Sequence, residues 1–385
     1  MNRAIPVSRS VPPLFRNSCR CAGILAALLF EVHLSAQHTV TVKYVGYTDN
    51  NQVTVNTGAL DLAATLPAGV QLTLGTVLDG ISAASRALPL VDGISAATTR
   101  VRLEQTEVRR DWSVGVSRRF GETTLGVLFD DSSEDDYASQ SWSCSVLHEM
   151  NRRNTGLNLV ITRYDDRIFP YGVTWQDTRN AVITDIALTQ VLTPTAQARL
   201  SLSYTREDGF LDNPYHRVGI ALADGTTYYF AERHPTGRDR AACSILYVHG
   251  FPEAGPSSVH LDYRAYTDNW RITSHTFGAQ YHRRFTDAVS AYLRTRYYTQ
   301  TGAFFFRNTY REEERFMTAD TKLAPLSSLL YGIGVTWSVL PWCTVDLSFE
   351  DYRQFTSLDY TPLYTSIAKR DLEARMLYLG TTFNF

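Results

Sequence analysis

Regular alternation of apolar and polar residues is the feature that most restricts what this chain can fold into. In residues 289–300, Leu293 and Tyr297 share one parity, and Arg294 and Arg296 share the other. Because successive side chains of a β-strand point to opposite sides, this segment has one apolar face and one charged face. The same alternation recurs in residues 198–204, 259–265 and 345–350. A soluble sandwich would also alternate, so the pattern predicts strands without choosing between a sandwich and a barrel.

Connection lengths separate these two architectures. The predicted strands lie near residues 40–48, 53–66, 69–78, 110–119, 122–131, 137–149, 154–165, 181–192, 196–206, 238–250, 257–267, 272–285, 288–300, 328–340, 342–353 and 373–385. Counted back from the C-terminus, short turns alternate with longer connections. The longest connections lie at residues 79–109, 166–180, 207–237, 301–327 and 354–372.

All of these long connections fall on the same side of the predicted sheet. Membrane barrels have short periplasmic turns and long outer loops, whereas a soluble sandwich has no reason to keep this parity. We therefore predict an all-β fold, a transmembrane antiparallel β-barrel of about sixteen strands with long extracellular loops. An even number of strands leaves both termini in the periplasm.

The N-terminal segment has the composition of an export signal. Basic residues precede an apolar core at residues 21–30, which is too short to span a membrane but fits a secretory signal. Leu34-Ser35-Ala36, before Gln37, provides a cleavage site. We expect residues 1–36 to be a signal peptide and residues 37–385 to form the outer-membrane β-barrel.

The C-terminal residues indicate how such a barrel would reach its membrane. Leu377, Leu379, Phe383 and Phe385 recur at every second position up to the final carboxylate, with Thr381 as the interruption. A terminal aromatic residue after alternating apolar residues resembles the signal that the outer-membrane barrel assembly machinery reads. We therefore expect Phe385 to be the assembly signal, the assembly machinery and outer-membrane lipid to be partners, and the cell outer membrane to be the location.

Charge and motif content argue against several function classes. The formal net charge is −2, whereas a nucleic-acid partner requires a basic surplus. Cys144, Cys243 and Cys343 follow the signal, an odd and widely spaced set that does not make a disulfide framework. The sequence lacks the His-Glu-x-x-His, Gly-x-Ser-x-Gly, Cys-x-x-Cys-His and phosphate-loop motifs, and its histidines lack metal-ligand spacing. We expect no catalytic residues, no cofactor and no metal; an outer-membrane hydrolase is the less favoured alternative.

Three other sequence patterns could have a structural or ligand-binding role. Asp-Gly-Ile-Ser-Ala-Ala occurs at residues 79–84 and again at 92–97, both within the loop predicted at 79–109. An acidic run could bind a hard cation through its oxygens, although it lacks ordered EF-hand spacing, so a solvated loop is the main interpretation; its members are Asp130, Asp131, Glu134, Asp135 and Asp136. Ion pairs or anion capture are predicted for a third set, Glu232, Arg233, Arg238, Asp239 and Arg240.

The charged faces of the predicted strands would line the barrel interior. The candidate lumen-facing residues are Arg199, Asp262, Arg264, Arg294, Arg296, Asp346 and Glu350. A barrel of this size can enclose an aqueous channel, so a pore or transporter for small solutes or ions is the first prediction. The alternative is a closed scaffold for a periplasmic or surface partner, in which loops 79–109 and 301–327 fill the lumen and the interior charges pair.

Several motifs also carry a family resemblance. They include the two Asp-Gly-Ile-Ser-Ala-Ala copies and the segments at residues 134–137, 151–155, 188–192, 209–215, 232–235, 238–240, 263–264, 270, 297–300 and 350–354. Together they resemble a bacterial outer-membrane family known only as a domain of unknown function, number thirty-five seventy. The resemblance implies a barrel over nearly the whole mature chain. It transfers no catalytic residue, because no activity is established for the family.

Overall fold

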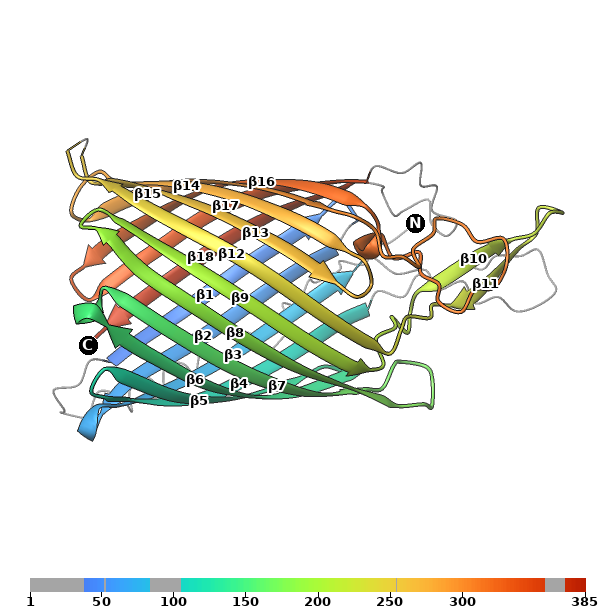
Figure 1. Cartoon of the computed structure of the whole chain (residues 1–385), viewed down its shortest axis with the longest axis horizontal. Helices are drawn as coiled ribbons and strands as arrows, with labels where there is room; N and C mark the ends of the chain where they lie inside the picture. The colour runs from blue at the N-terminus through green and yellow to red at the C-terminus, as the bar shows by residue number, and fades with distance from the viewer. Residues whose placement is uncertain (1–37, 52, 84–104, 254, 357–370) are drawn as a thin grey trace, which may run out of the picture. The chain divides into compact units, whose positions relative to one another are not determined.

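Long strands make up nearly all of the computed structural model, which describes residues 38–51, 53–83, 105–253, 255–356 and 371–385. Sixteen strands in these residues form one closed antiparallel barrel (Figure 1). They are β1 (His38–Asp49), β2 (Val53–Leu66), β3 (Val70–Ala83), β4 (Gln105–Phe120), β5 (Thr123–Ser133), β6 (Tyr137–Met150), β7 (Thr155–Ile168), β8 (Asp177–Thr193), β9 (Ala196–Gly209), β12 (Gly237–Phe251), β13 (Ser257–Asp268), β14 (Thr273–Arg284), β15 (Val289–Gln300), β16 (Leu326–Leu340), β17 (Cys343–Thr356) and β18 (Leu372–Asn384). The predicted all-β class, strand number and transmembrane-barrel architecture are confirmed.

Strands that are adjacent in sequence are also adjacent in the barrel. The two special places are an inserted sheet and the seam that joins the first strand to the last. The insertion is a separate two-stranded sheet, β10 (Arg217–Ala221) and β11 (Thr227–Ala231), between β9 and β12. The seam joins β1 to β18, and the backbones of His38 and Phe385 exchange two hydrogen bonds there, at 3.1 and 2.9 Å. Closure leaves no unpaired edge strand in the barrel, which is what a sheet in lipid requires.

The outward face of the barrel is apolar. Leu293 is 58% exposed and Ile333 is 51% exposed, and they stand opposite each other on β15 and β16. Such exposure of large aliphatic side chains is expected where lipid rather than water covers the surface. Aromatic residues lie near both ends, with Trp342 and Phe285 near the short turns and Trp142 near the long loops. Two aromatic girdles around an apolar band are typical of outer-membrane barrels.

Short connections occupy one end of the barrel. Two of them are the 3-10 turns η1 (Pro67–Gly69) and η2 (Asn151–Arg153). The C-terminus lies at this end (Figure 1), and His38, the first described residue, is hydrogen-bonded to Phe385 there. Within the described residues, no helix is long and apolar enough to cross a membrane. The signal peptide expected at residues 1–36 lies outside the described residues.

The long connections gather at the other end, where two of them pack together. The β10–β11 hairpin protrudes beyond the barrel end beside residues 301–325 (Figure 1). Backbone bridges join Ile220 to Tyr310 and Arg233 to Met317. A buried apolar cluster of Val218, Ile220, Tyr310 and Met317 fills the contact. We call the hairpin and residues 301–325 together the outer subdomain.

One loop expectation, for residues 79–109, needs correction. Residues 301–325 pack at the long-loop end, where Phe305 and Phe306 are buried with Trp270 and Ile272, and Tyr310 is buried against the hairpin. The loop predicted at 79–109 is shorter, because β3 continues to Ala83 and β4 begins at Gln105. The first Asp-Gly-Ile-Ser-Ala-Ala copy therefore lies mostly on strand β3 rather than in a loop. The second copy lies outside the described residues.

Candidate functional site

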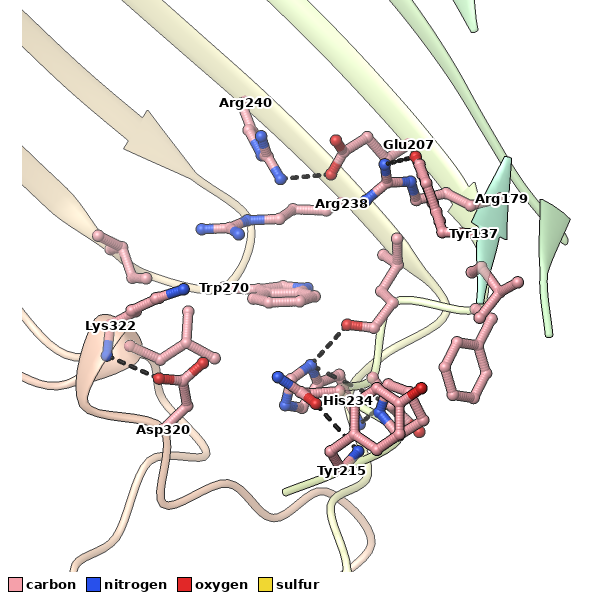
Figure 2. A pocket seen from close by; sticks show the side chains of 18 of the residues that line it. Tyr137, Arg179, Glu207, Tyr215, His234, Arg238, Arg240, Trp270, Asp320 and Lys322 are labelled. Carbon is pink, nitrogen blue, oxygen red and sulfur yellow. Dashed lines mark hydrogen bonds and ion pairs between the residues drawn. The ribbon is translucent and has the colours of Figure 1, made fainter. Parts of the chain in front are cut away.

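A cavity of about 590 Å³ opens at the long-loop end of the barrel (Figure 2). Ends of β8, β9, β12, β13 and β15 form its wall, and residues 210–215 and η3 (Thr321–Leu323) contribute from the loops. We call it the mouth pocket. Its charged and aromatic lining residues include Glu134, Asp136, Tyr137, Arg179, Glu207, Phe210, Asp212, Tyr215, His234, Arg238, Arg240, Arg264, Tyr266, Trp270, Asp320 and Lys322.

Two arginines of β12 are held in place by crossed ion pairs. Arg238 stands opposite Glu207 in the strand register but pairs with Asp268 of β13 at 2.5 Å. Arg240 stands opposite Asp268 but pairs with Glu207 of β9. Side chains at diagonal positions on one face of a sheet can reach each other in this way. The Arg238 guanidinium also lies 4.2 Å from the ring centroid of Trp270, which favours a fixed orientation.

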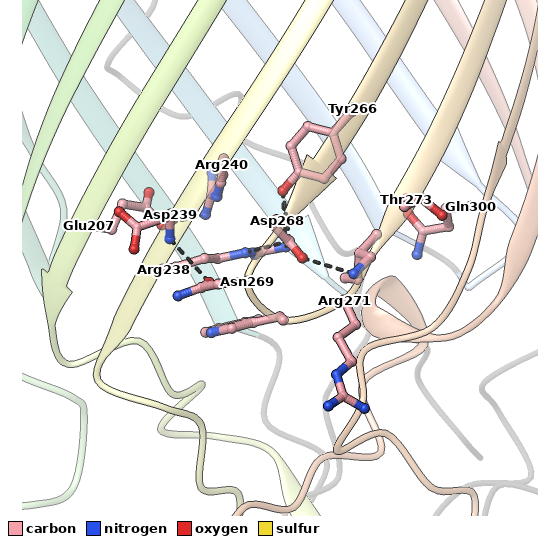
Figure 3. A network of polar contacts seen from close by, with 12 residues as sticks. Glu207, Arg238, Asp239, Arg240, Tyr266, Asp268, Asn269, Arg271, Thr273 and Gln300 are labelled. Atoms are coloured by element: carbon pink, nitrogen blue, oxygen red, sulfur yellow. Dashed lines mark hydrogen bonds and ion pairs between the residues drawn. The ribbon is translucent and has the colours of Figure 1, made fainter.

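The acid that pairs with Arg238 is completely buried. The side chain of Asp268 is 0% exposed, and Figure 3 shows it between Arg238 and Tyr266. Its Oδ2 accepts a hydrogen bond from the Tyr266 hydroxyl at 2.8 Å, and its Oδ1 accepts one from the Ile272 amide at 2.8 Å. A buried carboxylate needs such partners, and they make this corner of the pocket rigid.

The remaining cations of the mouth pocket differ in how they are compensated. Arg179 donates to the buried Asp166 at 2.7 Å. Arg264 and Lys322 are both exposed and make no ion pair with any described residue. The Arg264 guanidinium instead lies 5.4 Å from the ring centroid of Tyr266. The positive charges of Arg264 and Lys322 are therefore available to a solute in the mouth pocket.

Carboxylates gather at another part of the pocket. One oxygen from each of Glu107, Glu134 and Asp136 lies within 4.8 Å of the others, and Asp136 accepts a hydrogen bond from the Tyr215 hydroxyl. Burial, together with the charge of Asp136, raises the pKa of Glu134 above its ordinary value. Oxygen ligands of this kind suit a hard cation.

The predicted acidic run is divided between different places. Glu134 and Asp136 join the carboxylate group of the mouth pocket, whereas Asp131 accepts hydrogen bonds from Trp112 and Gln140 on neighbouring strands. Glu107 of β4 completes the group, and sequence position gave no indication of it. These five acidic residues therefore do not form one cation site.

A chain of histidines and carboxylates links the two segments of the outer subdomain. Glu232 is 3% exposed, and its Oε1 accepts hydrogen bonds from Thr318 Oγ1 at 2.9 Å and the Ala319 amide at 3.1 Å. Its Oε2 lies 3.4 Å from His234 Nε2 and 3.6 Å from His216 Nδ1. The Glu232 carboxylate thereby contacts residues 318–319 through one oxygen and the two histidines through the other.

Protonation makes this arrangement favourable. His234 Nδ1 lies 2.8 Å from the Leu211 carbonyl, so it carries a proton that it donates there, and Nε2 faces the carboxylate. Burial alone would lower the pKa of His234, but Glu232 overcomes this and raises it. Burial alone would raise the pKa of Glu232, but His216 and His234 lower it to about 2. The His234–Glu232 pair lies within residues 232–234, and the other oxygen of this carboxylate accepts the hydrogen bonds from Thr318 and Ala319 that join this segment to residues 301–325.

The structure brings two of the candidate lumen-facing residues together. Arg294 Nη1 lies 2.8 Å from Glu350 Oε1, and Glu350 is only 4% exposed. Arg294 and Glu350 stand on β15 and β17 on either side of Gly332 of β16. Because Gly332 has no side chain, the ion pair can lie flat across that strand.

The other candidates make fewer contacts. Asp262 of β13 and Arg296 of β15 flank Gly278 in the same way, and the Asp262 carboxylate occupies the space where a Cβ of Gly278 would lie. Asp346 accepts a hydrogen bond from Thr336 at 2.5 Å. Arg264 lines the mouth pocket. Arg199 of β9 stands opposite Leu246 and shares its strand face with Glu207.

The ion pairs predicted around residues 232–240 are present, with partners that the sequence did not identify. Arg233 pairs with Glu313 at 2.8 Å, and Arg238 and Arg240 pair with acids of the neighbouring strands. Asp239 accepts a hydrogen bond from the Tyr204 hydroxyl at 2.7 Å. The three described cysteines are free thiols.

Comparisons with solved structures found similar outer-membrane proteins, among them one with a TM-score above 0.5. CdiB from Acinetobacter baumannii superposes with a TM-score of 0.53 at 10% identity, over 91% of this chain and 60% of that chain. A bacterial polysaccharide outer membrane secretin gives a TM-score of 0.49 at 9% identity, over 92% and 100% of the two chains. The outer membrane protein OpdK from Pseudomonas aeruginosa gives 0.45 at 10% identity, over 91% and 99%. This chain thus spans about 60% of the length of CdiB.

The apolar band, the aromatic girdles and the closed sheet make the chain an outer-membrane β-barrel protein. No curated protein sequence matches it. One family model does, over residues 172–365, and its description is a protein of unknown function (DUF3570). The matched range includes the motifs from residue 188 to residue 354 and excludes those before 172. The chain therefore belongs to the DUF3570 family.

Proposed function

We propose that this barrel is a pore or transporter that passes small solutes or ions across the outer membrane, without a catalytic step. The observation that supports the proposal is the mouth pocket, a cavity of about 590 Å³ between the strand ends and the loops. A second cavity of about 820 Å³ lies at the short-turn end, lined by Ser258, His282 and Ser290 among others. Hollows at both ends of one closed sheet favour a conduit.

The charged side chains of the wall would set the selectivity of this conduit. We propose that all seven candidates line the lumen, namely Arg199, Asp262, Arg264, Arg294, Arg296, Asp346 and Glu350. Their strand parity opposes that of the exposed Leu293 and Leu347 where they share a strand with them. The pairing of Arg294 with Glu350 cancels two of these charges, which leaves Arg296 and Asp262 as the more effective determinants nearby.

Conductance in planar lipid bilayers tests the proposal directly. The purified barrel should give steady ionic currents, and Arg296→Ala should move the reversal potential in a salt gradient toward cation selectivity. Leu293→Ala, on the opposite face of the same strand, is the matched control and should leave selectivity unchanged. A barrel that inserts into the bilayer and stays silent would refute the pore.

A scaffold for a surface partner is the second candidate, and the outer subdomain favours it. Tyr228 is 55% exposed and Phe230 is 37% exposed on β11, on a hairpin held by the buried cluster around Tyr310. Exposed aromatic residues on a rigid support are common in protein-binding surfaces. If the barrel is a pore, deletion of residues 222–226 should leave its conductance intact. If the barrel is a scaffold, the same deletion should abolish binding of the surface partner.

Export and assembly complete the proposal. We propose that residues 1–36 direct secretion and that Phe385 is recognised by the barrel assembly machinery before it takes its place in the β1–β18 seam. The exchange of hydrogen bonds between Phe385 and His38 is compatible with this sequence of events. Outer-membrane lipid is then the permanent partner of the apolar face.

A further inference from the structure

Uncompensated charges of opposite sign lie on opposite walls of the barrel mouth. Lys322 lies between β15 and β16, and Glu134 and Asp136 lie between β5 and β6. In the closed strand order, eight strands separate these positions in one direction (β6–β9 and β12–β15). Eight also separate them in the other (β16–β18 and β1–β5). Figure 2 shows Lys322 across the mouth pocket from Tyr137, which is the chain neighbour of Asp136.

Each wall carries more than one such charge. Arg264 of β13 adds to Lys322, and neither makes an ion pair with a described residue. Glu134 and Asp136 line the other wall with Glu107 of β4 behind them, and no ion pair joins any of these three to a described residue. Burial is the largest cause of the raised pKa of Glu134; the charge of Arg109 and a hydrogen bond with Glu107 oppose the rise, and the charge of Asp136 adds to it.

The ion pairs between these walls contribute no net charge. Arg179, Arg238 and Arg240 each have one carboxylate partner and brace the pocket. Two further lining carboxylates, Asp212 and Asp320, each lie within 4 Å of a histidine, at 3.9 Å from His234 and 3.8 Å from His216. Phe210 and Trp270 add apolar surface to the lining. A volume of about 590 Å³ lies within the usual range for small-ligand pockets, about 300–1,000 Å³.

We propose that the mouth pocket selects dipolar solutes, small molecules with an ammonium group at one end and a carboxylate at the other, such as amino acids and short peptides. Arg264 and Lys322 face the carboxylate, and Glu134 and Asp136 face the ammonium group. A singly charged solute is attracted by one wall and repelled by the other, whereas a dipolar solute is attracted by both. This inference rests on the proposed pore, because selection at the mouth matters when solutes pass through it.

Liposome swelling with two probes of similar size tests the proposal. Glycylglycine is dipolar, and arabinose is uncharged. The wild-type barrel should admit glycylglycine faster than arabinose by about threefold or more, since fields of this kind raise encounter rates by tenfold or beyond in favourable cases. Equal rates for the two probes would overturn the dipolar-solute proposal and leave the pore standing.

Variants of the two walls separate dipolar selection from a simple charge filter. Arg264→Gln with Lys322→Gln, and Glu134→Gln with Asp136→Asn, should each bring the glycylglycine rate down to the arabinose rate. The first pair should shift ion selectivity toward cations, and the second should shift it toward anions. Unchanged arabinose swelling in each variant shows that the barrel has folded and inserted. If only one pair removes the preference, the two-wall arrangement is refuted.

Matched controls lie outside the pocket on the same loop. Arg311 and Glu312 are exposed, line no part of the mouth pocket and carry the same charges. Arg311→Gln and Glu312→Gln should leave the glycylglycine preference as in the wild type. A loss of preference in either control would show that the overall charge of the outer subdomain, and not the pocket, is responsible.

Calorimetric titration of the detergent-solubilised barrel makes the two proposals separable. Glycylglycine should bind, and N-acetylglycinamide, which lacks both charges, should not. Binding that both pairs of wall variants abolish would support the site even if the liposomes fail to swell with any probe, in which case the pore fails by itself. Absence of glycylglycine binding together with absence of a swelling preference would overturn the site.

Discussion

Arg294 of β15 and Glu350 of β17 form an ion pair of 2.8 Å across the strand that separates them. The pair can form because Gly332 lies between them, where a Cβ would come within 3.1 Å of Glu350 Cγ. Gly278 has the same place between Asp262 and Arg296, and the Asp262 carboxylate lies over it, although no ion pair with Arg296 is present among the described contacts. Glycines on this face of the sheet thus give charged side chains room to extend across a strand.

Removal of Arg294 should therefore destabilise the barrel. Arg294→Ala leaves Glu350 nearly buried without its cation, at an expected cost of roughly 1–3 kcal/mol after allowance for the partial exposure of the arginine. The temperature at which the folded form disappears in heat-modifiability gels should fall. Arg296→Ala, which removes no ion pair among the described contacts, is the control. Restoration of the transition temperature in an Arg294→Ala, Glu350→Ala double variant would identify the unpaired carboxylate as the cause.

A charge on the outer face should be more harmful than the loss of one inside. Leu293 is 58% exposed on the apolar face of β15. Leu293→Arg should cost roughly 2–4 kcal/mol if the residue lies near the middle of the bilayer. Yields of folded, membrane-embedded protein should drop accordingly, while Leu293→Phe should insert normally. Equal yields of the two variants would place this face in water.

The outer subdomain should be accessible on intact cells. Asp224 and Gly225 form the tip between β10 and β11, where the Gly225 amide donates to the Leu222 carbonyl at 3.1 Å. An epitope tag inserted after Asp224 should react with antibody before the membrane is opened. A tag in the short turn at Pro194–Thr195 should react only afterwards. The reverse result would invert the topology.

A tag placed further along the subdomain would be a poorer probe. The chain around Asn308 supports buried Phe306 and Tyr310. An insertion there would disrupt packing, and a negative antibody result would then report misfolding.

Packing of the outer subdomain should depend on pH in a defined direction. The pKa of Glu232 falls from 4.5 to about 2, so its contribution is full above about pH 4.5 and is lost as pH falls through about 2. The pKa of His234 is raised above 6.5, so its contribution is full below about pH 6.5 and is lost as pH rises through the raised value. The segments should hold together best between these limits.

Hydrogen exchange of residues 217–231 can measure this dependence. Exchange should be faster at about pH 9 than at about pH 6 after correction for the intrinsic rate. His216 lies 3.6 Å from Glu232, Asp212 lies 3.9 Å from His234, and Asp320 lies 3.8 Å from His216. Glu232→Gln should weaken packing by roughly 3 kcal/mol and remove the pH dependence. A pH dependence that survives this substitution would assign it to another group.

The last residue should matter for assembly. Phe385→Ser, or deletion of Phe385, should leave the chain in the periplasm and exposed to degradation. Fractionation after pulse labelling measures this outcome. Phe383→Tyr keeps an aromatic ring two positions earlier and serves as the control. Normal amounts of heat-modifiable protein in the outer membrane would show that Phe385 is not the assembly signal.

Alternation predicted the strands well, because it is a local consequence of where side chains point. Each predicted strand overlaps one observed strand, from 40–48 in β1 to 373–385 in β18. The prediction for the first Asp-Gly-Ile-Ser-Ala-Ala copy is wrong because the predicted strand ends at residue 78, whereas β3 continues to Ala83. On β3, Gly80 stands opposite Asn56 and Val108 and simply continues the ladder.

The site was predicted less completely, because its contacts join residues that are far apart in sequence. Glu232 and Thr318 are 86 positions apart and still share a hydrogen bond. The strand pattern shows which face Arg238 and Glu207 occupy, but diagonal pairing depends on register and side-chain reach. The β10–β11 hairpin was also missed, since two strands of five residues inside a long connection give too few alternations to recognise.

The β1–β18 seam has a consequence for the order of folding. Fourteen of the sixteen contacts around the barrel join strands adjacent along the chain, and β9 meets β12 across a local insertion. The seam alone joins residues as distant as Thr39 and Asn384, 345 positions apart. Hairpins can therefore form early and independently, whereas closure carries the largest loop entropy and cannot begin before the final strand arrives. Until the seam closes, the chain is an open sheet whose two edge strands have unpaired backbone N–H and C=O groups. The longer this state lasts, the longer the sheet is exposed to proteases and to pairing with other incompletely folded barrels.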